Sequence, residues 1–127
     1  MARKLMDIVN QFRNDVPQFV STDLVHIESG LSLGGGSIDP NFDASVASAS
    51  YSELVKSNAR ALDLLGAGAA STEDILITTK DLYILIRMVG RDHYHGLAIT
   101  RQGTLGYARA IMKKYEGQFL DALKELA

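Results

Sequence analysis

The sequence predicts an α+β fold in which one five-stranded antiparallel sheet lies between helices, with the element order α-β-β-α-β-β-β-α. Apolar residues recur at helical spacing in three segments, and five short strand-like runs lie between these segments. The links between neighbouring runs are short, which favours antiparallel pairing. A chain of 127 residues has the length of a single domain, so residues 1–127 are predicted to form one.

The first helix is predicted from Arg3 to Val16, because its apolar residues form one stripe and Pro17 then ends it. A β-hairpin follows. Its strands are predicted at Leu24 to Glu28 and at Leu31 to Leu33. Ser29-Gly30 joins them, since glycine tolerates the positive φ that tight hairpin turns require.

The second helix is predicted from Asp43, a typical N-cap residue, to Leu65. The segment Gly66-Ala67-Gly68 is its stop signal. Before this helix, the sequence GGGSIDPNFD is predicted to be a loop. Small residues fill the start of the helix, so either another surface approaches its backbone closely or its first turn is tightly packed within the chain.

Three strands are predicted next, at Asp74 to Thr79, Leu82 to Val89 and His95 to Arg101. The middle run is apolar over almost its whole length. It is therefore predicted to be a central strand, with helices on both faces of the sheet. The last helix begins after Thr104, a second N-cap residue, and continues to the end of the chain.

Composition and charge exclude several classes of protein. Thirteen Lys and Arg against fifteen Asp and Glu give a formal net charge of -2 without a basic block, so no nucleic-acid partner is expected. There is no cysteine, which excludes disulfides and thiolate metal sites. Asp7, Asn10 and Gln11 interrupt any signal peptide and no apolar run could span a bilayer, so a cytoplasmic protein with no membrane contact is expected.

The stretch SGLSLGGGSIDP, residues 29–40, allows three interpretations. Gly30 to Gly34 matches the nucleophile-elbow pattern G-x-S-x-G, but Ser32 would lie inside a strand with no helix directly after it. Gly34 to Gly36 could offer backbone N–H groups to a phosphate, although the lysine of a P-loop is missing. An edge strand that bends or bulges before a crossover loop is favoured, and whether Gly34 to Gly36 bind a ligand stays open.

Two histidines occur in Asp92-His93-Tyr94-His95. In an extended segment His93 and His95 point to the same side and could share a metal ion, but a third ligand would have to come from elsewhere. A polar turn between two strands is favoured instead, and the role of both residues stays open. His26 is expected to be half-buried with a hydrogen-bond partner. No catalytic, cofactor-binding or metal-binding residue is assigned, so no enzymatic activity and no cofactor are expected.

Three segments together resemble the roadblock/dynein-light-chain family: VHIESGLSLGGGS, DILITTKDLYILIRMVG and HGLAITRQGTLGYAR. The similarity is to the bacterial single-domain, MglB-like members and covers nearly the whole chain. It implies a sheet with the order second, first, fifth, fourth, third strand. It also implies a homodimer, and a non-enzymatic platform that binds and regulates a small Ras-like GTPase in signalling, polarity or motility.

The resemblance implies that the third strands pair across the dimer axis, with the second helices side by side. In this sheet order the run DILITT is an unprotected apolar edge. The expected dimer residues are Leu54, Asn58, Ala61, Ile75, Leu76, Ile77 and Thr78. The expected GTPase contacts are Ser45, Ser48, Ser52 and Lys56. Two alternatives remain: a small-ligand sensor with a pocket beneath the glycine-rich loop, and a structural adaptor indifferent to the partner's nucleotide state.

Overall fold

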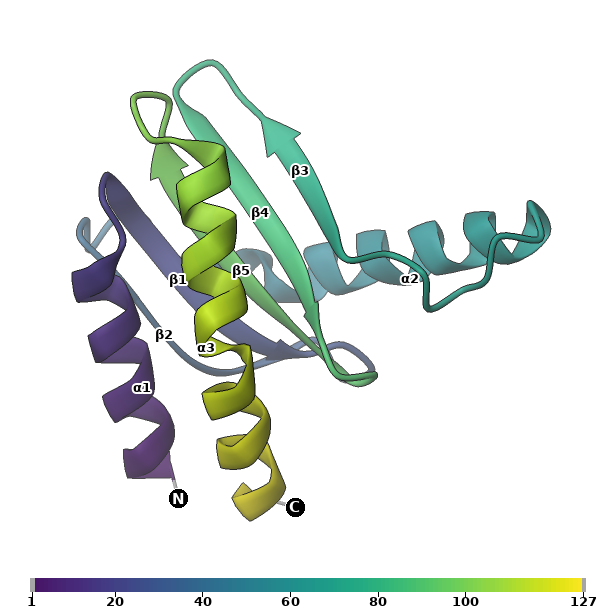
Figure 1. Cartoon of the computed structure of the whole chain (residues 1–127), viewed down its shortest axis with the longest axis horizontal. Coiled ribbons are helices and arrows are strands. Elements are labelled where there is room, and N and C mark those ends of the chain that lie inside the picture. The colour runs from purple at the N-terminus through teal and green to yellow at the C-terminus, as the bar shows by residue number, and fades with distance from the viewer. Residues whose placement is uncertain (1, 127) are drawn as a thin grey trace.

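A computed structural model of the chain describes residues 2–126 and shows one antiparallel sheet with helices on both faces (Figure 1). The strand order is β2-β1-β5-β4-β3, as the resemblance implies. The predicted fold class and the order α-β-β-α-β-β-β-α are therefore confirmed. The strands are β1 (Phe19–His26), β2 (Leu31–Ser37), β3 (Asp74–Thr78), β4 (Leu82–Val89) and β5 (His93–Thr100).

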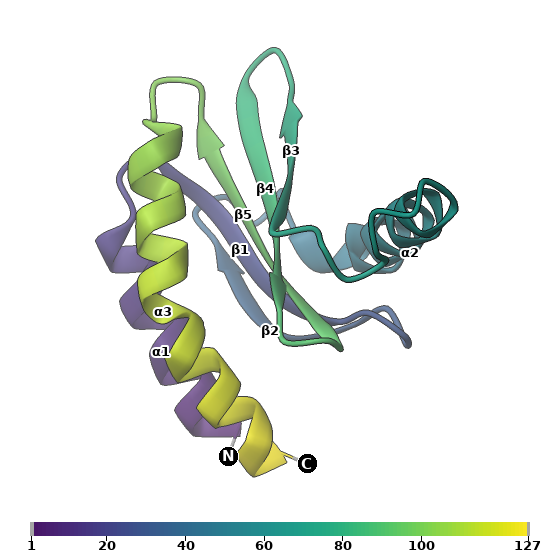
Figure 2. The ribbon, with the colours of Figure 1, turned by 45° about the vertical axis from the view of Figure 1, so that its right-hand side comes forward.

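Helices α1 (Ala2–Asp15) and α3 (Leu105–Leu126) lie side by side on one face of the sheet (Figures 1 and 2). Their apolar stripes meet in an aromatic centre where Phe12 contacts Tyr115 and Phe119 edge-on. Burial of these rings, together with the aliphatic side chains around them, stabilises the packing on this face. Both ends of the described chain lie together at one end of these helices.

A short 3-10 helix, η1 (Ala44–Ala47), and helix α2 (Ser48–Leu64) lie on the opposite face. The buried residues of α2 are Ser48, Ser52 and Val55, all in its first half. Its second half extends away from the sheet (Figures 1 and 2), and Leu64 just before its end is 90% exposed. No helix within residues 2–126 is long and apolar enough to cross a bilayer.

The first hairpin differs from the prediction in three respects. Strand β1 begins at Phe19, five residues early, because its polar residues are buried and broke the expected alternation. The link is the turn Ile27–Gly30, in which Gly30 has the predicted positive φ of 72°. Strand β2 includes Gly34 to Gly36, which pair with β1, so the prediction of a loop at these glycines is wrong.

The second helix starts differently from the prediction, because its first four residues form η1 before α2 begins. Asp43 is the predicted cap, and its Oδ1 accepts a hydrogen bond from the Ser45 backbone N–H at 3.0 Å. Gly66 and Gly68, with φ of 72° and 94°, lie just beyond the end of α2. The predicted stop is therefore confirmed.

Candidate functional site

Strand β3 is an end strand of the sheet and, within residues 2–126, pairs only with β4. Its outer side presents backbone N–H and C=O groups along its length. Leu76, at its centre, is 37% exposed, and Thr78 is exposed as well. The predicted open edge is therefore present, and a strand from a second molecule can pair with it.

Ile75 and Ile77 of this strand face α2 and are only partly buried. They pack against a small cluster of four buried side chains, namely Val25, Val55, Ile86 and Tyr94. Since only the first half of α2 contributes buried residues, this apolar face continues to the edge of the sheet without full cover. Such a surface favours contact with another protein.

The interface candidates on α2 lie on its accessible side. Leu54 is 38% exposed and Ala61 is exposed. Asn58 is half-buried, and its Nδ2 donates a hydrogen bond to Thr72 Oγ1 at 2.7 Å, which ties α2 to the loop before β3. The structure thus brings α2 and β3 together as one surface. The assignment of this surface to a homodimer stays a prediction.

Two of the four predicted GTPase contacts are accessible to a partner. Ser45 is exposed on η1, where its hydroxyl donates to Asp43 Oδ1 at 2.7 Å. Lys56 on α2 donates to the Glu28 carbonyl at 3.2 Å and lies 3.3 Å from Glu53 Oε1. Both residues are on the outer side of the α2 face, so they remain candidates.

The other two predicted contacts, Ser48 and Ser52, are 4% and 1% exposed, so their side chains face the sheet rather than a partner. The Ser48 hydroxyl donates to the Gly30 carbonyl at 2.7 Å. This bond explains the small residues at the start of the helix, because Ala49 also lies against Gly30. The interpretation as a tightly packed first turn fits these contacts.

The glycine-rich strand is built for close packing. A Cβ at Gly35 would lie 2.4 Å from the Thr22 carbonyl oxygen, and one at Gly36 would lie 2.5 Å from Arg13 Nη1. A register shift opposite Leu24 and Val25 marks a bulge, as the favoured interpretation requires. Ser32 lies in β2 and the next helix starts only at Ala44, so no nucleophile elbow is formed.

Asp23 is a buried acid that the sequence analysis did not single out. It is 4% exposed, and its Oδ1 accepts a hydrogen bond from the Ser32 hydroxyl. The pKa of Asp23 is raised to about 6, mainly by burial and also by the nearby Asp43, while the Ser32 bond acts in the opposite direction. The available signal was one carboxylate in the middle of the strand FVSTDLVH.

The two histidines of the sequence DHYH begin strand β5, so the prediction of a polar turn at this place is wrong. His93 lies beside His26, with ring centroids 5.2 Å apart, whereas His95 is fully buried. No group of three His, Asp or Glu side chains in residues 2–126 could hold a metal ion. His26 is half-buried and 2.8 Å from the Ser29 hydroxyl through its Nδ1, as expected.

His95 is a core residue between the aromatic rings of Phe12 and Phe119. Its Nε2 lies 2.8 Å from Thr22 Oγ1, and that hydroxyl donates its proton to the Gly96 carbonyl at 2.7 Å. The imidazole must therefore carry its proton on Nε2 and donate to Thr22. The pKa of His95 is lowered to about 3, mainly by burial and also by Arg87, so the ring is neutral.

Solved structures show which known proteins share this fold. MglB from Myxococcus xanthus superposes with a TM-score of 0.87 at 14% identity, over 99% of this chain and 92% of that one. The gliding protein MglB from Thermus thermophilus gives 0.83 at 11% identity, over 98% and 91% of the two chains. A roadblock/LC7 domain from Streptomyces avermitilis gives 0.78 at 14% identity, over 92% and 95%.

No protein-family model matches the sequence. No curated protein matches it either. The likeness is thus one of three-dimensional structure, and at these identities it establishes the fold alone. Within residues 2–126 this fold leaves the β3 edge and the neighbouring face of α2 accessible.

Proposed function

Starting from the roadblock fold of this chain, we propose that the protein is a non-enzymatic, homodimeric platform that binds and regulates a small Ras-like GTPase in signalling, polarity or motility. The observation that carries the proposal is the open β3 edge beside the partly covered α2 face. The name of the Thermus thermophilus protein, a gliding protein, supports a role in motility. The family resemblance supports the GTPase as partner.

The homodimer forms when the β3 edges of two molecules pair antiparallel around a twofold axis. Backbone hydrogen bonds then satisfy the N–H and C=O groups that the monomer leaves open on this strand. Ile75 and Ile77 lie close to α2 in the monomer, so the second helices of the two copies meet over the same apolar face. A self-complementary contact of this kind closes at two copies.

The dimer acts on the GTPase by shape. A rigid surface that holds the switch segments of a GTPase in one arrangement changes its hydrolysis rate without adding a catalytic group. Ser45 and Lys56 contribute to this surface, because both are accessible on the α2 side of the molecule. A Lys56→Glu variant should lose the GTPase, while Lys114→Glu, at an exposed lysine of α3 on the opposite face of the sheet, should retain it.

Leu76→Lys is the substitution that tests the homodimer. A lysine at the centre of the β3 edge adds charge to the paired strands, so monomers are expected in sedimentation velocity. Leu33→Lys is the matched control, because Leu33 has the same exposure of 37% but lies on β2 at the other edge. A Leu76→Lys protein that sediments like the wild type, or dissociation of Leu33→Lys, would contradict the assigned interface.

The partner is tested by capture from native lysate on the tagged protein, in parallel with a non-hydrolysable GTP analogue and with GDP. Retention of a Ras-like protein in one nucleotide state, and its loss with Lys56→Glu, supports the platform. Equal retention in both states identifies a structural adaptor instead. Retention of no GTPase in either state overturns the proposal.

A further inference from the structure

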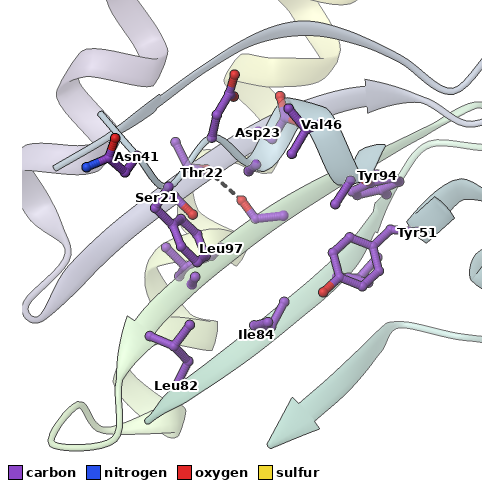
Figure 3. A pocket seen from close by; sticks show the side chains of 17 residues that line it. Ser21, Thr22, Asp23, Asn41, Val46, Tyr51, Leu82, Ile84, Tyr94 and Leu97 are labelled. Carbon is purple, nitrogen blue, oxygen red and sulfur yellow. Dashed lines mark hydrogen bonds between the residues drawn. The ribbon is translucent and has the colours of Figure 1, made fainter. Parts of the chain in front are cut away.

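A pocket of about 310 Å³ lies between the sheet and the segment that leads into α2 (Figure 3). We call it the sheet pocket. Strands β1, β4 and β5 form one wall, and residues 41–43, η1 and the start of α2 form the other. Apolar and aromatic side chains line most of it, among them Phe42, Tyr51 and Ile84. Neither the packing of the core nor the proposed GTPase surface accounts for this pocket.

Asp23 lines the sheet pocket from β1 (Figure 3). Its carboxylate is 4% exposed, and its Oδ2 has no hydrogen-bond partner within residues 2–126. A buried polar atom without a partner is costly, and a carboxylate oxygen especially so. Asp23 is one of the residues that line the pocket, so a donor bound there would complete the site.

The charges around Asp23 select a cation. A second cavity adjoins the sheet pocket along β2 and η1, shares Asp23 and Asp43 with it, and adds Asp39 at its rim. Within the described residues, no lysine, arginine or histidine lines either cavity. Three carboxylates without a basic residue repel phosphates and other anions. A nucleotide beneath the glycine-rich strand is therefore disfavoured.

The lining also distinguishes an organic cation from a metal ion. Calcium takes six to eight oxygen ligands and magnesium six. No set of three acidic or histidine side chains in residues 2–126 could supply them. A pocket lined by one buried carboxylate and, elsewhere, by Phe42, Tyr51 and Ile84 instead suits a molecule with one charged end and an apolar body.

We propose that the sheet pocket binds a small organic ammonium compound, whose charged nitrogen donates to Asp23 Oδ2 and whose apolar body lies against Phe42, Tyr51 and Ile84. The nearby Asp43 adds attraction for the ammonium group. A bound ammonium group would lower the pKa of Asp23, which burial raises to about 6. This inference does not rest on the proposed GTPase function.

Three probes of one shape test the site on the wild-type protein: phenethylammonium, phenethyl alcohol and phenylpropionate. Each is titrated while amide NMR signals of the residues that line the sheet pocket are recorded. Phenethylammonium is expected to shift these signals in a saturable manner, and the alcohol and the carboxylate are expected to bind at least roughly tenfold more weakly. The measurement requires neither the GTPase nor the dimer, so its failure is distinct from a failure of the proposed function.

Two variants assign the effect to Asp23. Asp23→Asn keeps the shape and the bond from Ser32 but removes the charge, so phenethylammonium is expected to bind it at least roughly tenfold more weakly. Asp81→Asn removes a carboxylate from the exposed turn between β3 and β4, and it should bind as the wild type does. The comparison of probes on the wild type holds even if Asp23→Asn folds poorly.

Several outcomes would overturn the inference. Equal binding of phenethyl alcohol means that the pocket is merely apolar. An Asp23-dependent response to calcium, without one to phenethylammonium, means a metal site. No response to any cationic probe means that a water molecule satisfies Asp23 Oδ2.

Discussion

Two buried residues on neighbouring strands respond to pH in opposite directions. Asp23 on β1 has its pKa raised to about 6, so between its ordinary value of 3.8 and 6 the folded state binds more protons than the unfolded state. Its contribution to stability therefore falls as the pH rises through this window. His95 on β5, with its pKa lowered to about 3 from 6.5, makes stability rise with pH over 3 to 6.5.

Asp23→Asn should separate these two effects. The variant removes the cost of ionising a buried carboxyl, so its free energy of unfolding relative to the wild type should rise between about pH 4 and pH 6 and then level off. The largest slope is about 1.4 kcal/mol per pH unit. Urea unfolding of both proteins at a series of pH values measures it. A difference that does not change with pH would show that Asp23 is not perturbed by burial.

Asp23 also shows why a helix cap is easier to predict from the sequence than the lining of a pocket. Asp43 was predicted as a cap, because capping depends on neighbours in the sequence. The environment of Asp23 depends on Ser32, on the other strand of the hairpin, and on η1 above it. No local pattern reports such a juxtaposition. The burial of Ser48 and Ser52 was missed for the same reason.

At the scale of elements, α2 divides into two halves with different support. Ser48, Ser52 and Val55 are buried in its first half, whereas Leu64 and Leu65 at its end are 90% and 79% exposed. The chain returns from this exposed end to begin β3. The second half of the helix therefore depends on its own hydrogen bonds, on Asn58, and on any partner that covers it.

Amide hydrogen exchange should show that the two halves of α2 differ in local stability. In the monomeric Leu76→Lys variant, amides of residues 57–64 are expected to exchange faster than those of residues 52–56, because few buried contacts oppose local opening. In the wild type, pairing of two copies should slow exchange in residues 57–64 and in β3. Equal protection of both halves in the monomer would mean that α2 is held along its whole length.

Elements with strong periodicity were predicted within a few residues. The stripe of α1 and the continuous apolar run of β4 each bury a face in the way that their spacing indicates. Strand β1 was harder to predict, because it buries the polar residues Ser21, Thr22 and Asp23. The glycines of β2 were also harder to predict, because Gly35 is required by its close approach to the Thr22 backbone. Both features depend on the surroundings of the strand in the folded chain rather than on its own sequence.

At the scale of the whole molecule, the sheet packs against two apolar clusters, one on each face. One cluster joins α1 and α3 to the sheet, and the other joins α2 to it. Strands β1, β4 and β5 contribute side chains to both. Loss of either cluster therefore removes support from strands that the other needs, and this favours cooperative unfolding of residues 1–127 as one domain.

The single domain can be tested by following both clusters at once. The native-state methyl NMR signals of Val9 on α1 and Val55 on α2 should be lost with the same urea midpoint. Ile8→Val, which removes one buried methyl group from the α1 side and costs about 0.5–1.5 kcal/mol, should lower both midpoints equally. If Ile8→Val left the Val55 midpoint unchanged, the α2 face would unfold as an independent unit.

The two edges of the sheet are not equivalent. Strand β3 is regular in its pairing with β4, whereas β2 carries the bulge and has Arg13 lying over Gly36 and bonded to the Ser37 carbonyl at 3.3 Å. Growth of a fibril by stacking of sheets end to end requires an acceptor at both borders of every molecule. Within residues 2–126 only the β3 border is regular, so a second copy paired there, as proposed, would leave no regular border for a third.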